Sequence, residues 1–428
     1  MSVLKLKPAC KDYLWGGHRL AEEYGVKYDG EILAEAWELS CHPDGPSTIV
    51  NGPYAGKTLE QYIETVGRQV MGTHCRRFRD FPILIKFIDA KQNLSIQVHP
   101  DNRYALKNEG QYGKTEMWYI MDAKEGAFLY YGFRKEISKE EFAKRIQEDT
   151  LLEVLNPVPV HKGDVLFIQS GTIHAIGKDI LIAEIQQNSN VTYRVYDYGR
   201  VGKDGKKRDL HIEKALAVTN RVPIVKSGSC YPHIADCDYF TVDKLNLDGK
   251  MMKMMEGTVT EETFVSILML DGEGTITADG ETISYKKGDS LFLPAGTGDY
   301  KIEGSCDALI TSIRENAGMV RIGINVTEHG TMIGLVDENN KLLAADVAAA
   351  GGNTTTEELA KVTGKAVNAL LEKEKIGLDQ CTGAGLALPS GWEGKGEEAA
   401  NALAAYLPLP ITTADDSKTA VIGAANLI

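Results

Sequence analysis

Short apolar runs, several of them alternating with polar residues, fill the first three quarters of the chain. They are separated by Gly, Asp and Asn turns, and examples are FPILIKFIDA, EMWYIMDA, GAFLYYGF, ILIAEIQQ, SILMLDGEGTIT and DALITSI. Short strands at such close spacing, with little helix between them, predict an antiparallel sandwich or barrel of jelly-roll type. This part of the chain is therefore expected to be mainly β.

Helical spacing is confined to a minority of segments in this region. Ser138 and Glu141 form a capping-box pattern before a run in which Phe142 and Ile146 repeat at helical spacing. A second helix is predicted from Thr58. These helices interrupt the β pattern.

One β-unit occurs twice. The segments HKGDVLFIQSGTIHAI (161–176) and KKGDSLFLPAGTGDYK (286–301) share a Lys-Gly-Asp turn, an apolar strand, a turn around Gly-Thr and a return strand. A duplicated unit indicates two related β-domains. At the position of His174 in the first copy, the second copy has Asp299.

The composition changes near residue 316. The following residues are rich in Ala, Gly and Thr, and their pattern predicts two strands, VRIGINVT and TMIGLVDENNKLLAAD, then a helix, a strand and a helix. This order is typical of an α/β domain. We therefore expect three domains, at 1–220, 221–316 and 317–428.

Charge and cysteine content restrict the class of protein. Lys and Arg number 47 against 60 Asp and Glu, a net charge of −13, which argues against nucleic acid or an anionic membrane as the main partner. The seven cysteines form no C-x-x-C pair, as expected of a protein in the reducing cytoplasm. No signal peptide or membrane-spanning run is recognisable.

The stretch SIQVHP (95–100) places polar side chains on one face of a predicted strand. Ser95, Gln97 and His99 alternate with apolar residues, so they point the same way. Glu116, at the start of another strand, and His174, after the first Gly-Thr turn, complete a set of nitrogen and oxygen ligands for a divalent transition ion. Zinc is the first choice, one ion per chain; a lone histidine on a strand is more often structural.

Four segments together resemble type I mannose-6-phosphate isomerase, also called phosphomannose isomerase, in its short bacterial form. They are LSIQVHPD, GKTEMWYI, GTIHAI and VTYRVYDYGR, and the resemblance extends over about residues 1–315. It implies a bicupin fold with a helical insertion, a zinc ion, and interconversion of mannose 6-phosphate and fructose 6-phosphate through a cis-enediol. By match to these segments, the zinc ligands are Gln97, His99, Glu116 and His174.

The same resemblance assigns roles in the substrate pocket. Arg194 is expected beside the reacting carbons, whereas Lys114 and Ser95 are expected to hold phosphate. Trp15, Glu38 and Tyr193 are weaker candidates for the pocket rim. The general base stays open between Lys114 and a metal-bound water, and a proton-transferring histidine found before the lysine in longer relatives is replaced here by Gly113.

The last domain resembles the first lobe of the ROK group of sugar kinases and repressors, an actin-like (ribonuclease H-like) α/β fold. Gly334 to Asp337 match the group, and Asp416 falls at its catalytic base. However, Thr327, Glu328 and His329 stand where the phosphate-binding hairpin requires glycines and a threonine, and a glutamate there repels phosphate. We expect a truncated, non-catalytic lobe that serves packing, homo-oligomerisation or regulation.

Two other functions are compatible with the residues alone. One is a non-catalytic sugar-phosphate sensor, which would bind ligand without turnover. The other is a bifunctional isomerase and sugar kinase, which would require ATP consumption that depends on Asp416.

Overall fold

The computed structural model divides into two compact units. The first comprises residues 1–73 and 81–314, and the second comprises 74–80 and 315–428. The division at residue 314 lies next to the boundary expected near 316. The residues that the structure describes are 3–202, 205–225, 230, 232–315, 320–337, 341–374, 376–389, 391–392, 394–409 and 411–413.

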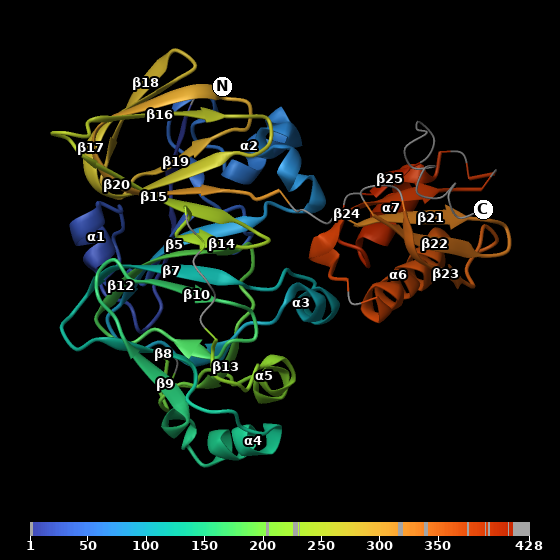
Figure 1. Cartoon of the computed structure of the whole chain (residues 1–428), viewed down its shortest axis with the longest axis horizontal. Coiled ribbons are helices and arrows are strands. Elements are labelled where there is room, and N and C mark those ends of the chain that lie inside the picture. The colour runs from blue at the N-terminus through green and yellow to red at the C-terminus, as the bar shows by residue number, and fades with distance from the viewer. Residues whose placement is uncertain are drawn as a thin grey trace. The chain divides into compact units, whose positions relative to one another are not determined.

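The first unit is mainly β (Figure 1). Its first strands and helices are β1 (Leu4–Lys7), β2 (Ala9–Lys11), α1 (Arg19–Tyr24), β3 (Glu35–Leu39), β4 (Thr48–Ile49), α2 (Leu59–Val66), β5 (Ile83–Ala90), β6 (Ile96–Val98), α3 (Asn102–Glu109), β7 (Glu116–Ala123), β8 (Phe128–Phe133), α4 (Lys139–Gln147), β9 (Leu155–Pro159), β10 (Val165–Ile168), β11 (His174–Ala175), β12 (Ile180–Gln187), β13 (Tyr193–Tyr196) and α5 (Ile212–Val218). The remaining strands are β14 (Ala235–Asp236), β15 (Thr241–Asp248), β16 (Met254–Val259), β17 (Val265–Ala278), β18 (Glu281–Lys286), β19 (Ser290–Leu293) and β20 (Gly298–Ser312). Short 3-10 turns add η1 (Gly52–Tyr54), η2 (Arg68–Met71) and η4 (Leu151–Glu153), whereas η3 (Thr73–Arg77) belongs almost entirely to the second unit.

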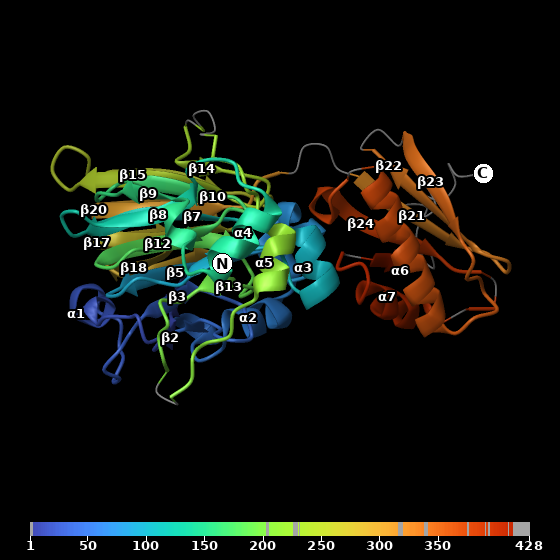
Figure 2. The same ribbon diagram turned by 90° about the horizontal axis from the view of Figure 1, so that it is seen from below.

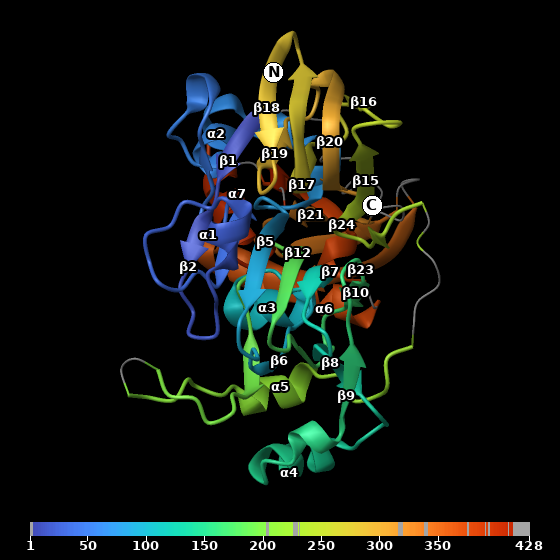
Figure 3. The ribbon, with the colours of Figure 1, turned by 90° about the vertical axis from the view of Figure 1, so that its left-hand side faces the viewer.

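Two sheets of this unit pack face to face. One has the order β10-β7-β12-β5-β3-β2, and Figure 3 shows its strands β5, β12 and β7 side by side. The other has the order β13-β6-β11-β8-β9. Apolar side chains from both sheets, among them Ile88, Trp118, Leu129 and Ile182, form one buried cluster between them.

Helices cover the outer face of the five-stranded sheet. Ile96 and Val98 of β6 point to that face and join a buried cluster with Phe142 of α4 and Leu216 of α5. Figure 2 shows α3, α4 and α5 gathered at one end of this unit. Because side chains alternate along β6, the opposite face of this sheet is left for the polar residues between the apolar ones.

A third, nine-stranded sheet is formed mainly by residues 235–312. Its main path is β14-β15-β20-β17-β19-β1-β4, with β16 paired to β20 and β18 paired to β17. Strand β1 pairs with β19 and with β4, so the N-terminus of the chain contributes to the second of the expected β-domains. Within the described residues, each sheet runs between edge strands rather than around a closed ring.

The duplicated segments form the same turn. In the first, the backbone N–H of Asp164 donates to His161 O and the Asp164 carboxylate accepts from the His161 N–H. In the second, Asp289 makes both bonds with Lys286. The glycine before each aspartate has a positive φ, 93° at Gly163 and 87° at Gly288, which explains why both turns use glycine.

Both helices predicted in this region are present. Helix α2 begins after Thr58, which forms a complete capping box with Gln61. Helix α4 begins after Ser138, whose hydroxyl accepts from the Glu141 N–H. None of the described helices is long and apolar enough to cross a membrane.

The second unit is an α/β domain. Its sheet has the order β23-β22-β21-β24-β25, in which the first three strands are antiparallel and the last two pair in parallel. Figure 2 shows α6 and α7 lying together beside this sheet. Its elements are β21 (Val320–Val326), β22 (Thr331–Val336), β23 (Leu342–Ala348), α6 (Thr356–Lys373), η5 (Leu378–Gln380), β24 (Cys381–Ala387), α7 (Gly396–Ala404) and β25 (Ile411–Thr413).

One sequence expectation in this unit was wrong in detail. The segment 331–346 was expected as a single strand, but it is divided into β22 and β23. Between the two strands, the N–H of Asp337 donates to Lys341 O and the Lys341 N–H donates to the Asp337 carboxylate. Asp416 lies outside the described residues, so its predicted role has no structural counterpart.

Candidate metal centre and substrate pocket

Strand register brings the candidate residues of the five-stranded sheet into one row. Gln97 on β6 is directly opposite His174 on β11 and directly opposite Arg194 on β13. Residues opposite each other in a sheet have Cβ atoms on the same face, about 5 Å apart. The row therefore faces the interior between the two packed sheets, where Glu116 of β7 also lies.

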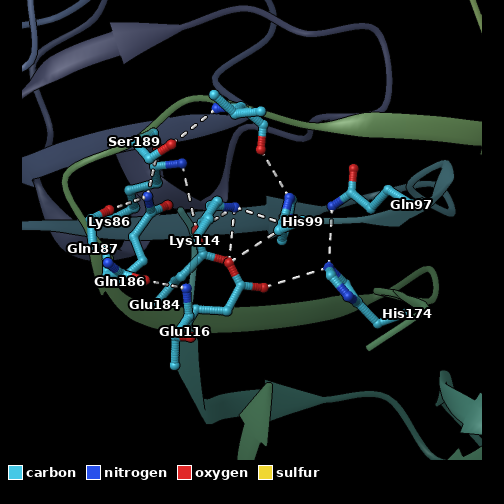
Figure 4. Close-up of polar contacts among 12 residues, drawn as sticks. Lys86, Gln97, His99, Lys114, Glu116, His174, Glu184, Gln186, Gln187 and Ser189 are labelled. Atoms are coloured by element: carbon cyan, nitrogen blue, oxygen red, sulfur yellow. Dashed lines mark hydrogen bonds and ion pairs between the residues drawn. The ribbon is translucent and has the colours of Figure 1, made fainter. Parts of the chain in front are cut away.

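The ligand atoms of His99, Glu116 and His174 lie within 4.8 Å of one another, and all three residues are buried. Figure 4 shows their side chains converging. The Nε2 atoms of His99 and His174 lie 3.7 and 3.4 Å from the Glu116 oxygens. The Gln97 amide nitrogen lies 3.5 Å from His174 Nε2, and a half-turn of the amide would present its oxygen instead. The structure thus brings all four predicted ligands together.

Both histidines have their Nε2 atoms directed to this centre. The Nδ1–H of His99 donates to Val191 O at 2.9 Å, and the Nδ1–H of His174 donates to Thr172 O at 2.8 Å. Burial lowers the pKa of His174 to about 4 and lowers that of His99 well below its usual value. The imidazoles are therefore neutral, with the Nε2 lone pairs available, as metal coordination requires.

The Glu116 carboxylate is fully buried, and neither oxygen makes a well-formed hydrogen bond within the described part of the chain. Burial, followed by repulsion from Glu184, raises the pKa of Glu116 to about 7. A bound divalent cation would add compensating positive charge to this buried carboxylate. The donor set of one carboxylate, two imidazoles and one amide fits such a cation.

Buried charges extend away from the metal centre. Lys114 Nζ lies 2.8 Å from Glu116 Oε2 and 3.1 Å from His99 Nε2. Lys86 Nζ lies 3.4 Å from Glu184 Oε1, whose partner oxygen accepts from the Trp118 indole N–H at 2.9 Å. Ammonium and carboxylate groups alternate along this line, so each buried charge has an opposite neighbour.

Arg194 lies at the end of the row opposite to His174, next to Ser95. Its Nε donates to Ser95 Oγ at 3.3 Å, and its Nη1 donates to the backbone oxygen of Asp209 at 3.0 Å. Ser95 and Arg194 are thus brought together as expected. Lys114 is instead engaged with Glu116 and His99.

The second copy of the duplicated unit carries no such centre. Asp299, at the position equivalent to His174, is exposed and accepts a hydrogen bond from Thr258 Oγ1 at 2.7 Å. His99, Glu116 and His174 form the one group of potential ligands found among the described residues. The second copy therefore serves as an internal control for the assignment of His174 as a candidate ligand.

Tyr193, one of the rim candidates, does not point into this space. Tyr193 is 2% exposed on the opposite face of β13 and donates its hydroxyl hydrogen to Glu109 Oε1 at 2.7 Å. Adjacent residues on a strand face opposite sides, so Tyr193 and Arg194 are directed apart. Trp15 is 4% exposed and packs in the apolar cluster between the sheets.

Glu38, the third rim candidate, is buried at a register irregularity of β3. Neither carboxylate oxygen has a hydrogen-bond partner within the described residues. Burial, followed by repulsion from Asp289, raises the pKa of Glu38 well above its usual value. Glu38 is therefore a neutral buried acid in the folded protein.

We expect Glu38→Gln to stabilise the protein, with a gain that increases with pH. The folded-state pKa of Glu38 is raised, so above the unfolded value the unfolded chain releases a proton that the folded chain keeps. Between the unfolded-state and the folded-state pKa of Glu38, the free energy of unfolding falls by about 1.4 kcal/mol per pH unit. Glutamine does not titrate, so it removes this loss. Urea unfolding at pH 5 and pH 8 measures the gain in the free energy of unfolding. Glu125→Gln, at an exposed position, is the control. An equal gain at both pH values would contradict the prediction.

Sequence reasoning missed Lys86 and Glu184. Both stand inside otherwise apolar runs, FPILIKFIDA and ILIAEIQQ, and each is at most 4% exposed. A charge within a buried strand was the signal that could have identified them, because such a charge requires a partner. Their pairing depends on the register of β5 with β12, where they stand directly opposite each other.

Comparisons with known proteins show which family this chain resembles. The family model "Phosphomannose isomerase type I, catalytic domain" matches residues 3–128, and "Mannose-6-phosphate isomerase, cupin domain" matches residues 232–313. The putative mannose-6-phosphate isomerase YvyI of Bacillus subtilis is 37% identical over 323 residues, covering 73% of this chain and 99% of the relative. The mannose-6-phosphate isomerase of Streptococcus mutans is 38% identical over 311 residues, covering 71% of this chain and 95% of the relative.

Solved structures give the same result. The crystal structure of mannose 6-phosphate isomerase from Bacillus subtilis superposes with a TM-score of 0.67 at 37% identity, covering 73% of this chain and all of that one. A putative mannosephosphate isomerase from Archaeoglobus fulgidus shares the fold, with a TM-score of 0.61 at 20% identity over 73% of this chain and 97% of that one. This chain therefore belongs to the type I mannose-6-phosphate isomerase family.

Proposed function

We propose that the protein interconverts mannose 6-phosphate and fructose 6-phosphate by proton transfer between C1 and C2 through a cis-enediol. The observation that carries this proposal is the convergence of Gln97, His99, Glu116 and His174 on one buried point, with Arg194 in the same row. These are the residues that the family resemblance assigns to the metal and the substrate. The family matches give no support to a non-catalytic sensor or to a bifunctional isomerase and kinase.

We propose that these four side chains hold one Zn²⁺. Two neutral imidazoles, a carboxylate and an amide oxygen suit a borderline ion such as zinc. When bound, the ion would supply Lewis-acid stabilisation of the negative charge that develops on the substrate oxygens. The protein's contribution is to fix the two Nε2 atoms through the carbonyls of Val191 and Thr172.

Lys114 and Arg194 take different parts in this proposal. Lys114 Nζ, in contact with Glu116 and His99, lies where a proton donor and acceptor can reach the reacting carbons. Arg194 lies one strand beyond Gln97, where its guanidinium group can bind substrate oxygens together with Ser95. Tyr193 acts as a packing residue behind the pocket, whereas Trp15 stays a candidate for the pocket rim.

Removal of metal tests the catalytic part of the proposal. We expect prolonged dialysis against a strong chelator to abolish isomerisation of mannose 6-phosphate, because no side chain can replace the charge of a divalent ion. Readdition of Zn²⁺ should restore the rate. A coupled assay and metal analysis of the same samples measure both steps, and full activity in metal-free protein would refute the proposal.

We propose that the first unit is a bicupin, with a metal-binding domain at 1–220, which includes the helical insertion, and a metal-free domain at 221–316. The matching turns at Asp164 and Asp289 support a duplicated unit. The pairing of β1 and β4 with the second sheet shows how closely the two halves are connected.

We propose that residues 317–428 form a ROK-like actin-type lobe without kinase activity. The antiparallel hairpin β21-β22, extended by parallel β24 and β25, supports this fold. Glu328 and His329 lie in the hairpin turn, where phosphate-binding backbone would be needed. Assembly of the protein through this lobe and its cytoplasmic location stay predictions.

A further inference from the structure

Two buried side-chain amides hold the backbone on either side of Lys114. The Gly113 N–H donates to Asn102 Oδ1 at 2.9 Å. The Thr115 N–H donates to Gln187 Oε1 at 2.9 Å. Gln187 Nε2 also donates to Asn102 Oδ1 at 2.8 Å, so the two side chains form one unit, which we call the amide pair.

The orientation of both amides is determined by the backbone groups that they bind. A backbone N–H can only donate, so the atom of Asn102 that Gly113 reaches is the oxygen. That oxygen accepts from Gln187, whose nitrogen therefore faces Asn102 and whose oxygen faces Thr115. Asn102 and Gln187 are 4% and 2% exposed, so solvent is excluded from these bonds.

The segment that carries Lys114 is also held against the chain that follows His99. The Lys114 N–H donates to the backbone oxygen of Pro100 at 3.0 Å. Gly113 lies so close to the start of α3 that a Cβ atom there would stand 2.3 Å from the carbonyl carbon of Asp101. Glycine is therefore required for this close approach, and any larger residue would push the segment away from α3.

The side chain of Lys114 depends on a fixed backbone. Its Nζ lies 2.8 Å from Glu116 Oε2 and 3.1 Å from His99 Nε2. A flexible four-carbon side chain keeps its ammonium group at such a point only if its Cα atom does not move. Misplacement of a reacting group by about 1 Å can lower a rate by about 10²-fold, so freedom of this segment would slow proton transfer.

We propose that Asn102 and Gln187 are positioning residues, which act on the reaction by fixing the backbone of Lys114. This inference rests on the proposed isomerase function and on proton transfer by Lys114 within it. Sequence reasoning selected neither residue, because their contact joins positions 85 residues apart along the chain. An amide pair that only stabilised the fold would leave the rate per folded molecule unchanged.

The test uses the full chain carrying Asn102→Leu, which has a side chain of similar size but no acceptor oxygen. We expect kcat for mannose 6-phosphate to fall by about 10- to 100-fold, with little change in KM or in metal content. Asn102→Asp keeps an oxygen at the same place and should recover most of the rate. The matched control is Asn51→Leu, because Asn51 Oδ1 accepts from the Lys5 N–H of β1 at 2.7 Å and should leave kcat unchanged.

A double substitution separates a positioning role from a structural one. If Asn102 acts through Lys114, Asn102→Leu should lower kcat no further in protein that already carries Lys114→Met. The same fold loss in both backgrounds would overturn the inference, because it would show that Asn102 supports the fold or the metal ligands in general. An unchanged kcat in Asn102→Leu alone would overturn it as well.

Amide hydrogen exchange separates this inference from the proposed function. Exchange in the peptide 110–117, followed by mass spectrometry, should be faster in Asn102→Leu than in the wild type, because Gly113 loses its acceptor. If the wild type fails to turn over mannose 6-phosphate, the proposed function is wrong, but faster exchange would still support the amide pair as the device that fixes Lys114. Unchanged exchange would overturn the inference whatever the rate.

Discussion

Replacing His174 with alanine is expected to release the bound metal and to lower kcat/KM at least about a thousandfold, as removal of several kcal/mol of charge stabilisation requires. The Nε2 atom of His174 faces the Glu116 carboxylate at 3.4 Å, and the side chain is fully buried. Because the site is buried, a water molecule cannot readily take the place of the lost imidazole ligand. Metal analysis of the purified variant and a coupled assay measure the two losses.

The duplicated unit supplies a matched control for this substitution. Asp299→Ala removes a side chain at the equivalent position of the second copy, which is exposed and accepts a hydrogen bond from Thr258 Oγ1. It should retain both metal and activity. Near-UV circular dichroism distinguishes loss of a ligand from loss of folding in the His174 variant. If both variants lost metal to the same extent, the centre would have been assigned to the wrong copy.

Local alternation was sufficient to predict much of the site. Ser95, Gln97 and His99 occupy one face because Ile96 and Val98 are needed on the other, where the helices pack. The same rule could have excluded Tyr193, since it is adjacent to Arg194 on one strand and the two cannot face the same pocket. That error arose from taking both residues from a single matching segment.

The pairing of strands that are far apart along the chain could not be predicted from the sequence. Whether Gln97 stands opposite both His174 and Arg194 depends on the register of three strands that are far apart along the chain. The same holds for β1, which joins a sheet formed by residues more than two hundred positions later. In the second unit, the expected order of elements along the chain was nearly correct, because its turns and helices are local features.

Lys114 is a candidate for two roles, proton transfer and phosphate binding, and its contacts favour the first. Its Nζ is within 3.7 Å of three groups, Glu116, His99 and Glu184, and the side chain is 6% exposed. A group so enclosed beside the metal ligands is placed for the reacting carbons rather than for the far end of the substrate. We expect Lys114→Met to lower kcat by about 10²- to 10⁴-fold, with little change in KM.

The control for Lys114→Met is Lys91→Met, which removes an exposed lysine that contacts Asp179 at 3.6 Å and should leave both constants unchanged. Metal content must be measured in each variant, because Lys114 touches two of the ligands. A variant that keeps its metal, binds mannose 6-phosphate normally and turns over slowly would establish proton transfer. A raised KM with kcat preserved would instead show that Lys114 holds the substrate phosphate, as the family resemblance implies.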